Sequence, residues 1–244
     1  MSTGCLCIHG YTGSPEEVEP LVDYLHLRTD WEFKVPTLPG HGTELDLRGH
    51  YYQEWIATAE LALLDLKSRH DTILIIGFSM GGMIASYLAA KHEVDRLVLL
   101  SAALKYISFP QLVKDTFGIA ADAWKGTLTN NPLFVRYQTK MKQTHFLSSF
   151  EFMKCVEFTK PYLQYVKCPT LIFQGKLDGM VPSRAANFLE QEIGSSHKKV
   201  VFLPNSKHLV CHDEDRDTLC ESVLYFLSKL SYEKKETEVG VYGS

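Results

Sequence analysis

The sequence predicts an α/β fold: a mostly parallel sheet of about six strands with helices on both faces. Short apolar segments rich in Val, Ile and Leu alternate along the chain with longer segments that carry apolar residues at helical spacing. Several apolar segments show no polar alternation, as expected for strands that are buried on both faces. Repeated strand–helix units form parallel sheets, and such sheets bind ligands at the carboxyl ends of their strands. Functional residues are therefore expected directly after strands.

The first half of the chain supplies four of the expected strands and three helices. Ser14, Pro15 and the two glutamates after them have the pattern of a helix start, with a capping hydroxyl, an early proline and acidic residues in the first turn. The segment Pro39-Gly40-His41-Gly42 is expected to be a compact loop after the second strand. In chain order we expect strands over residues 4–8, 33–38, 72–76 and 95–101, and helices over residues 14–27, 52–69 and from the region after residue 79 to about 91.

The alternation stops after the fourth strand and resumes at residue 169. The residues between are rich in aromatic side chains and contain no strand-like run, so residues 105–166 are predicted to form a small helical and loop-like cap (lid) over the carboxyl ends of the strands. Residues 1–104 and 167–231 would then form the core, and the charged residues 232–244 a flexible tail. The later strands are expected over 169–174 and 200–203, and the later helices over 183–194 and 213–230.

Composition argues against several classes of protein. The 244 residues carry a formal net charge of −4, which disfavours electrostatic binding to nucleic acid or to an anionic membrane. No stretch reaches the ~20 apolar residues of a membrane span. Residues 1–20 lack a signal-peptide pattern, so we expect a cytoplasmic protein without stable membrane insertion.

The six cysteines are too few for a disulfide scaffold. Cys5 and Cys7 are interpreted as core thiols on one strand face rather than as metal ligands.

The segment Gly77-Phe78-Ser79-Met80-Gly81 lies between an apolar strand and a helix. In this context the G-x-S-x-G pattern predicts a very tight strand-to-helix turn, with glycines two residues before and after the serine because side chains there would collide. The turn would expose the Ser79 hydroxyl at the carboxyl edge of the sheet, beside a helix N-terminus that favours developing negative charge. Ser79 is therefore the candidate nucleophile. The alternative is a glycine-rich turn with an incidental serine.

Three other strand ends carry residues that could assist a serine nucleophile. The segment His9-Gly10-Tyr11-Thr12-Gly13 follows the first strand, Asp178 follows the fifth, and His208 follows the sixth. The chain order serine, aspartate, histidine and the motifs around these residues resemble the α/β-hydrolase fold. With the loop Leu38-Pro39-Gly40-His41-Gly42-Thr43, the chain is similar in particular to small bacterial carboxylesterases related to monoacylglycerol lipases.

The resemblance implies a catalytic triad and an oxyanion hole. In the triad, His208 would be the base that takes the proton of Ser79, and Asp178 would orient the histidine and stabilise its charged form. The oxyanion hole would be formed by two backbone donors, the N–H of Tyr11 and the N–H of Met80.

Other histidines and acids compete for these roles. His212 is the closest competitor for the base, but the acidic residues that follow it are interpreted as the start of the last helix, with Asp213 as its cap. Asp178-Gly179 could instead be an ordinary turn. His9 and His41 are interpreted as residues that order their loops.

The resemblance implies a carboxylic-ester hydrolase that acts through an acyl-enzyme on small to medium acyl esters, such as monoacylglycerols or aryl esters. Its partners would be the ester and water, with no metal or organic cofactor and no nucleic acid. The same residues would also serve a thioesterase, an amidase or an acyltransferase, and a non-hydrolytic ligand receptor on this fold is a further hypothesis. The sequence leaves open whether the protein is a monomer or a dimer.

Overall fold

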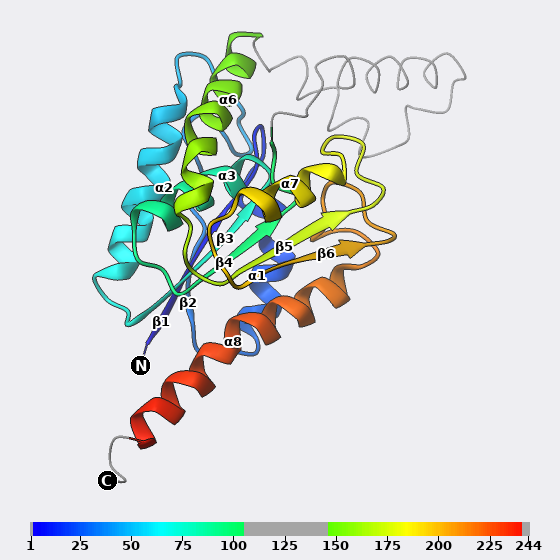
Figure 1. The fold of residues 1–244 in the computed structure, drawn as a ribbon. Coiled ribbons are helices and arrows are strands. Elements are labelled where there is room, and N and C mark those ends of the chain that lie inside the picture. Colours follow the sequence, from blue (N-terminus) through cyan, green and yellow to red (C-terminus); the bar gives the residue numbers. More distant parts are fainter. Residues whose placement is uncertain (1, 105–145, 241–244) are drawn as a thin grey trace.

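The computed structural model describes residues 2–104 and 146–240, with the backbone alone for residues 146–147 and 229–240. Its sheet contains six parallel strands in the order β2-β1-β3-β4-β5-β6 (Figure 1). The strands are β1 (Thr3–Ile8), β2 (Glu32–Lys34), β3 (Thr72–Phe78), β4 (Arg96–Leu100), β5 (Thr170–Gly175) and β6 (Lys198–Leu203). This parallel sheet confirms the predicted fold class.

Helices cover both faces of the sheet (Figure 1). They are α1 (Glu19–His26), α2 (Tyr52–Lys67), α3 (Met80–Lys91), α6 (Phe146–Thr159), α7 (Arg184–Glu192) and α8 (Arg216–Gly240), with the short 3-10 helices η1 (Pro15–Glu17) and η3 (Lys160–Tyr165). The helices α1 and α8 pack on one face, and α2, α3, α6 and α7 pack on the other.

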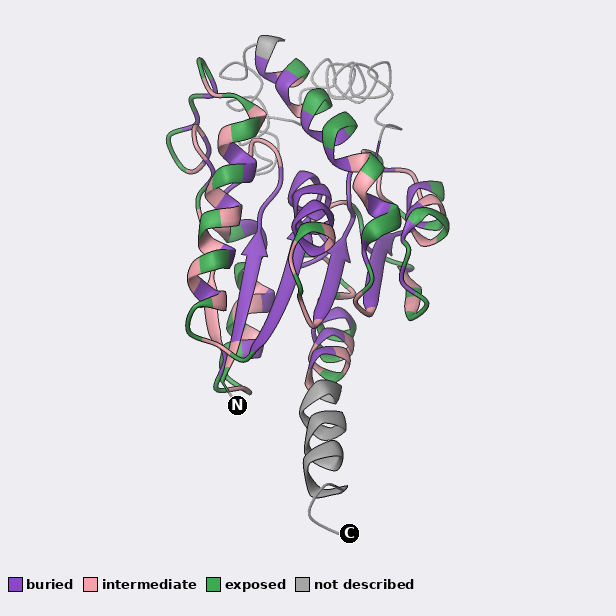
Figure 2. Cartoon of the chain, turned by 60° about the vertical axis from the view of Figure 1, so that its left-hand side comes forward, coloured by how far each residue is buried: buried purple, intermediate pink, exposed green. Residues whose placement is uncertain are grey.

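Each face of the sheet has its own apolar core because successive residues of a strand point to opposite faces. On β1, Cys5 and Cys7 face α1 and α8, whereas Leu6 and Ile8 face α2 and α3. The central strands β3 and β4 are buried throughout, and α3 is buried along nearly its whole length (Figure 2). Burial on both faces accounts for the missing polar alternation in these strands.

Two elements near the N-terminus differ from the prediction. The second strand is only Glu32–Lys34, because Pro36 cannot donate to a strand ladder and the Leu38 N–H is directed to a side chain, the imidazole of His9. The predicted helix over residues 14–27 is divided into η1 and α1, and the Ser14 hydroxyl makes no capping bond. Both changes lie beside the loop that follows β1.

The last helix also differs from the prediction. It was expected to end near residue 230 and to be followed by a tail over residues 232–244, but α8 continues to Gly240. Glu and Lys dominate residues 233–238, and both favour helix. Asp213 does not cap this helix. Its carboxylate accepts the N–H of Lys207 instead.

Residues 105–145 of the predicted cap lie outside the described residues. The described part of the predicted cap, which consists of α6 and η3, packs beside α2 and α3 (Figure 1). The Phe158 ring contacts the rings of Tyr52 on α2 and Tyr87 on α3, with centroids 5.5 and 5.4 Å away. The part of the insertion that returns to the sheet is therefore packed on the core, and the role of the insertion as a lid stays a prediction.

Candidate active site

Ser79 lies at the junction of β3 and α3 in a strained backbone conformation, with φ 53° and ψ −117°. A residue with a side chain at positive φ carries about 1–3 kcal/mol of strain and persists only when its surroundings hold it. The Ser79 N–H donates to the Leu100 carbonyl at 2.9 Å, and its own carbonyl accepts from Gly82 at 3.0 Å and Ala103 at 3.1 Å. Bonds to the end of β4 and to α3 therefore hold the turn.

The two glycines of the motif are required for close contacts on both sides of this turn. A Cβ at Gly77 would lie 2.4 Å from the carbonyl oxygen of Gly81, and a Cβ at Gly81 would lie 2.3 Å from that of Ile8. Such distances are shorter than any van der Waals contact. The first turn of α3 consequently packs, through Gly81, against the carbonyl oxygens of Ile8 and His9 at the end of β1.

The three residues singled out from the sequence form one chain of hydrogen bonds. Ser79 Oγ is 3.0 Å from His208 Nε2, and His208 Nδ1 is 2.8 Å from Asp178 Oδ2. An ionised Asp178 can only accept, so Nδ1 must carry the imidazole proton. The other nitrogen, Nε2, is then the acceptor for the Ser79 hydroxyl, which is the arrangement that general-base activation of a serine requires.

Asp178 is held in a site that favours its charged form. Its side chain is fully buried, Oδ1 accepts the N–H groups of Met180 (2.8 Å) and Val181 (2.9 Å), and Oδ2 also accepts Gln174 Nε2 at 2.9 Å. Burial by itself would raise the pKa of Asp178. The hydrogen bond and charge of His208, with the two backbone donors, outweigh burial and hold this pKa below its ordinary value.

The loop that carries His208 is tied to the start of α8 by acidic side chains. Asp215 accepts the Ser206 hydroxyl at 2.8 Å and the Asn205 N–H at 2.7 Å, and Asp213 accepts the Lys207 N–H at 2.7 Å. These bonds shape the residues directly before His208. The carboxylates of Asp213 and Asp215, which the sequence suggested as helix-start acids, thus anchor the histidine loop.

His212, the competing histidine, does not contact Ser79. Its Nε2–H donates to the backbone carbonyl of Glu16 at 2.8 Å, in the turn η1. His212 thus connects the histidine loop to the region after β1, while His208 lies against the serine.

The loop after β1 is ordered by His9, which is fully buried. His9 Nδ1–H donates to the Gly10 carbonyl at 2.9 Å, and Nε2 accepts the Leu38 N–H at 3.1 Å. One acceptor and one donor select a single neutral tautomer. Gly10 itself lies against the serine, since a Cβ there would be 3.1 Å from Ser79 Cβ. The expected oxyanion donor, the N–H of Tyr11, follows directly.

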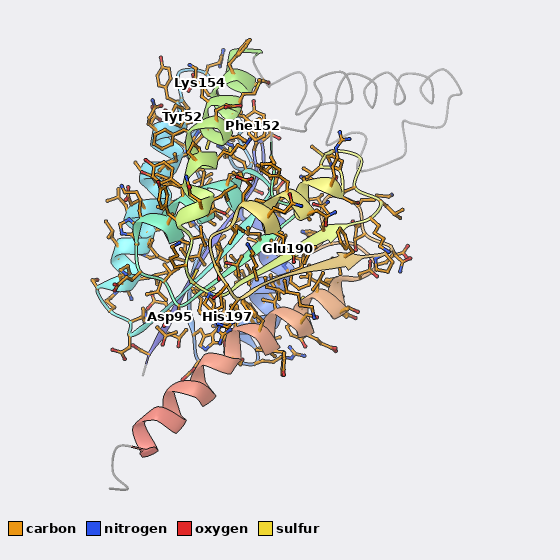
Figure 3. All side chains as sticks on the ribbon, viewed as in Figure 1. Tyr52, Asp95, Phe152, Lys154, Glu190 and His197 are labelled. Atoms are coloured by element: carbon orange, nitrogen blue, oxygen red, sulfur yellow. The ribbon has the colours of Figure 1, made fainter. Side chains whose placement is uncertain are left out.

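The side chain of Tyr11 is bound to the insertion. Its hydroxyl is 2.7 Å from Ser148 Oγ, and its ring stacks on Phe152 with centroids 4.9 Å apart, both residues being on α6. Figure 3 shows Phe152 on this helix at the same end of the molecule as Tyr52. Glu151 of α6 accepts the Tyr52 N–H at 3.3 Å. Helix α6 therefore makes hydrogen bonds both to α2 and to Tyr11, the residue expected to supply an oxyanion donor.

The cysteines of the described chain are free thiols. Cys5 and Cys7 share one strand face, with sulfurs 3.9 Å apart. Within residues 2–104 and 146–240, no group of three or more His, Cys, Asp or Glu side chains is arranged to hold a metal ion. No helix in the same residues is long and apolar enough to cross a membrane.

Sequence reasoning missed three supporting residues. Gln174, the penultimate residue of β5, donates to Asp178, and Asp215 anchors the Ser206 hydroxyl two residues before His208. A polar residue at the end of an otherwise apolar strand is a signal that could have identified Gln174. Glu17 was interpreted only as a helix-start acid, yet it is buried and accepts the Gly10 N–H.

Comparisons with known proteins identify hydrolases that are similar to this chain. A family model described as "Serine aminopeptidase, S33" matches residues 3–215. A thermostable monoacylglycerol lipase of Bacillus sp. (strain H-257) is 30% identical over 233 residues, which cover 93% of this chain and 90% of the relative. A carboxylesterase of Bacillus subtilis (strain 168) is 23% identical, with 93% of each chain covered. A solved structure from the metagenome-derived lipolytic enzymes LipS and LipT has a TM-score of 0.74 at 24% identity, covering 93% of this chain and 94% of that one.

Proposed function

The chain belongs to the serine aminopeptidase S33 family of hydrolases, and we propose that it is a carboxylic-ester hydrolase whose catalytic triad is Ser79, His208 and Asp178. The observation that carries the proposal is the unbroken hydrogen-bond chain from Asp178 through His208 to the hydroxyl of Ser79. This serine precedes a helix whose N-terminal N–H groups favour negative charge. The named relatives, a monoacylglycerol lipase and a carboxylesterase, support ester hydrolysis as the reaction class.

Acylation follows from the positions of the three side chains. His208 Nε2 takes the hydroxyl proton of Ser79 as Oγ attacks the ester carbonyl carbon, and Asp178 stabilises the imidazolium that forms. The N–H groups of Met80 and Tyr11 would bind the oxygen that becomes negative. His208 then gives its proton to the departing alcohol oxygen as the C–O bond breaks, which leaves an acyl-Ser79 ester.

Deacylation repeats these steps with water. His208 removes a proton from a water molecule that attacks the acyl carbon, and it returns that proton to Ser79 Oγ as the carboxylic acid leaves. Each step needs only side chains and backbone donors of this chain.

The proposed substrates are esters with a small to medium acyl chain, including monoacylglycerols. The monoacylglycerol lipase of Bacillus sp. supports this substrate class. An apolar acyl group also suits the aromatic surroundings of Tyr11, whose ring contacts Phe152, Trp55 and His41.

The test is an acyl-chain series of p-nitrophenyl esters and monoacylglycerols, measured on the wild type, Ser79→Ala and the exposed control Ser68→Ala. We expect loss of roughly 10³-fold or more of kcat in Ser79→Ala and no change in the control. A fluorophosphonate should label the wild type at Ser79. Full activity in Ser79→Ala, or folded wild-type protein that does not label, would refute the triad.

Two further substrates separate the related reactions. A matched acyl-CoA thioester tests for a thioesterase, and an aminoacyl p-nitroanilide tests the aminopeptidase activity that the family description names. We expect the oxygen ester to have the highest kcat/KM of the three. A higher value for the thioester or the anilide would keep the triad and change the substrate class.

A further inference from the structure

A buried carboxyl group lies inside the loop that follows β1, and the triad does not use it. Glu17, at the end of η1, has 9% of its surface exposed. Acidic side chains are rarely buried to this extent, because removing a carboxylate from water is costly unless hydrogen bonds replace the lost hydration. Glu17 Oε2 accepts the Gly10 N–H at 2.9 Å.

The loop is wrapped closely around the Glu17 carboxyl group. A Cβ at Gly13 would lie 1.9 Å from Oε2 and 2.6 Å from Oε1, and a Cβ at Gly10 would lie 3.2 Å from Oε2. The carboxyl group thus fills the space between these two glycines. Gly10 is in contact with Glu17 on one side and with Ser79 on the other.

Both polar backbone groups of Gly10 are consequently fixed. Its N–H is bound by Glu17, and its carbonyl accepts from His9 Nδ1–H at 2.9 Å and from the Gly13 N–H at 3.2 Å. Glycine is the most flexible residue of a chain, so these three bonds determine the local geometry. The Tyr11 N–H belongs to the same planar peptide as the Gly10 carbonyl and points the opposite way. Fixing Gly10 therefore fixes the direction of the Tyr11 N–H.

We propose that Glu17 is a positioning residue of the oxyanion hole, which acts as a buried hydrogen-bond acceptor for Gly10 and so directs the Tyr11 N–H toward Ser79. This inference rests on the proposed function, because it assigns the Tyr11 N–H to the reaction. The role requires an acceptor oxygen at a set distance from the loop. It does not require negative charge, which would oppose an oxyanion nearby.

Three substitutions separate the acceptor from the charge. Glu17→Gln keeps an acceptor oxygen at the same reach and removes the charge. Glu17→Asp keeps the charge but is one methylene too short to fill the loop, and Glu17→Ala removes both. The matched control is Glu19→Gln, the same change at an exposed glutamate two residues on.

Activity per active site is measured with p-nitrophenyl acetate, after the active serine is counted from the p-nitrophenol burst. We expect kcat to fall about 10- to 100-fold in Glu17→Ala, since removal of one oxyanion donor costs 10²–10³-fold and here the donor is only misdirected. Glu17→Asp should resemble Glu17→Ala, Glu17→Gln should recover most of kcat, and KM should stay nearly constant. Inhibition by an alkylboronic acid, which forms a tetrahedral adduct on serine, should weaken in parallel with kcat.

Specific outcomes would overturn the inference. Unchanged kcat per active site in Glu17→Ala, or recovery by Asp but not by Gln, would show that acceptor geometry is not the cause. If Glu17→Ala fails to fold, the Gln and Asp variants still decide through the order of their kcat values. Failure of the proposed function is distinguishable, because Ser79→Ala would then retain activity whatever residue occupies position 17.

Discussion

The two ends of the sheet carry similar charged side chains, but water reaches them very differently. At the amino end, Arg69 bonds to Glu32 and Asp65, and all three side chains are between 38% and 43% exposed. At the carboxyl end, the side chain of Asp178 is 0% exposed and that of His208 is 13% exposed. Water competes with the first set of bonds and is largely excluded from the second. Ion pairs at one end adjust stability slightly, while those at the other end can support chemistry.

The largest effect is expected at the carboxyl end, from loss of the base. His208→Ala should lower kcat by roughly 10³-fold or more, because among the described residues His208 is the side chain hydrogen-bonded to the Ser79 hydroxyl. His212→Ala is the matched control and should keep most of the activity, since this histidine bonds to the Glu16 carbonyl. Steady-state ester hydrolysis of both variants checks the assignment, and the opposite order would move the base to His212.

Asp178→Asn is expected to have the next largest effect, a fall in kcat of roughly 10³- to 10⁴-fold, because an amide can donate to Nδ1 and favour the wrong tautomer of His208.

The same substitution also tests the lowered pKa of Asp178 through the pH dependence of stability. An Asp with a lowered folded pKa stabilises the native state above its unfolded pKa of about 3.9, and this contribution is lost as the pH falls through the folded value. The stability difference between wild type and Asp178→Asn should therefore be constant near neutral pH and shrink in acid. Urea unfolding from pH 7 to pH 3 measures it, and a difference that grew in acid would contradict the lowered pKa.

A smaller effect is expected where the insertion meets the oxyanion loop. Tyr11→Phe removes the hydroxyl bond to Ser148 and keeps both the stacked ring and the backbone N–H. Loss of one partly buried hydrogen bond should cost about 0.5–1.5 kcal/mol of stability and lower kcat only a few-fold. Ser148→Ala should match it, and the double variant should be no worse than either single one. Additive losses would mean that the two hydroxyl groups act separately.

The smallest effect is expected at the amino end. Arg69→Ala should leave ester hydrolysis unchanged and lower the melting temperature slightly, because the guanidinium and its partners are exposed. The difference in melting temperature should decrease further in 1 M salt, which screens exposed charges. Thermal unfolding at two salt concentrations is the measurement. A loss of activity here would show that the two ends of the sheet are coupled.

The fold class and the positions of the site residues were predictable because they depend on local patterns. Apolar runs ended by glycine or polar residues identify the carboxyl ends of strands, and Ser79, Asp178 and His208 each follow such an end. The close contacts of Gly77 and Gly81 also follow from the spacing of the motif. Their proximity in space then results from the parallel order of the strands.

Other features were not predictable because they depend on which distant groups share a space. Glu17 has the sequence pattern of a helix-start acid, and only the folded loop shows that its carboxyl group lies between Gly10 and Gly13. Asp213 has the pattern of a helix cap but bonds to Lys207. The second strand was predicted too long, because no local pattern shows that the Leu38 N–H would pair with the imidazole of His9, in the loop after β1.

The positive φ of Ser79 has a consequence for how such a protein changes over generations. Glycine tolerates this conformation without strain, so Ser79→Gly would remove the strain of about 1–3 kcal/mol at this position. Part of this gain in stability would be offset, because glycine raises the conformational entropy of the unfolded chain. The substitution would also remove the hydroxyl group that we propose as the nucleophile. Selection for stability alone would thus favour loss of the hydroxyl, so a serine at this position is expected to persist only where the proposed reaction is under selection.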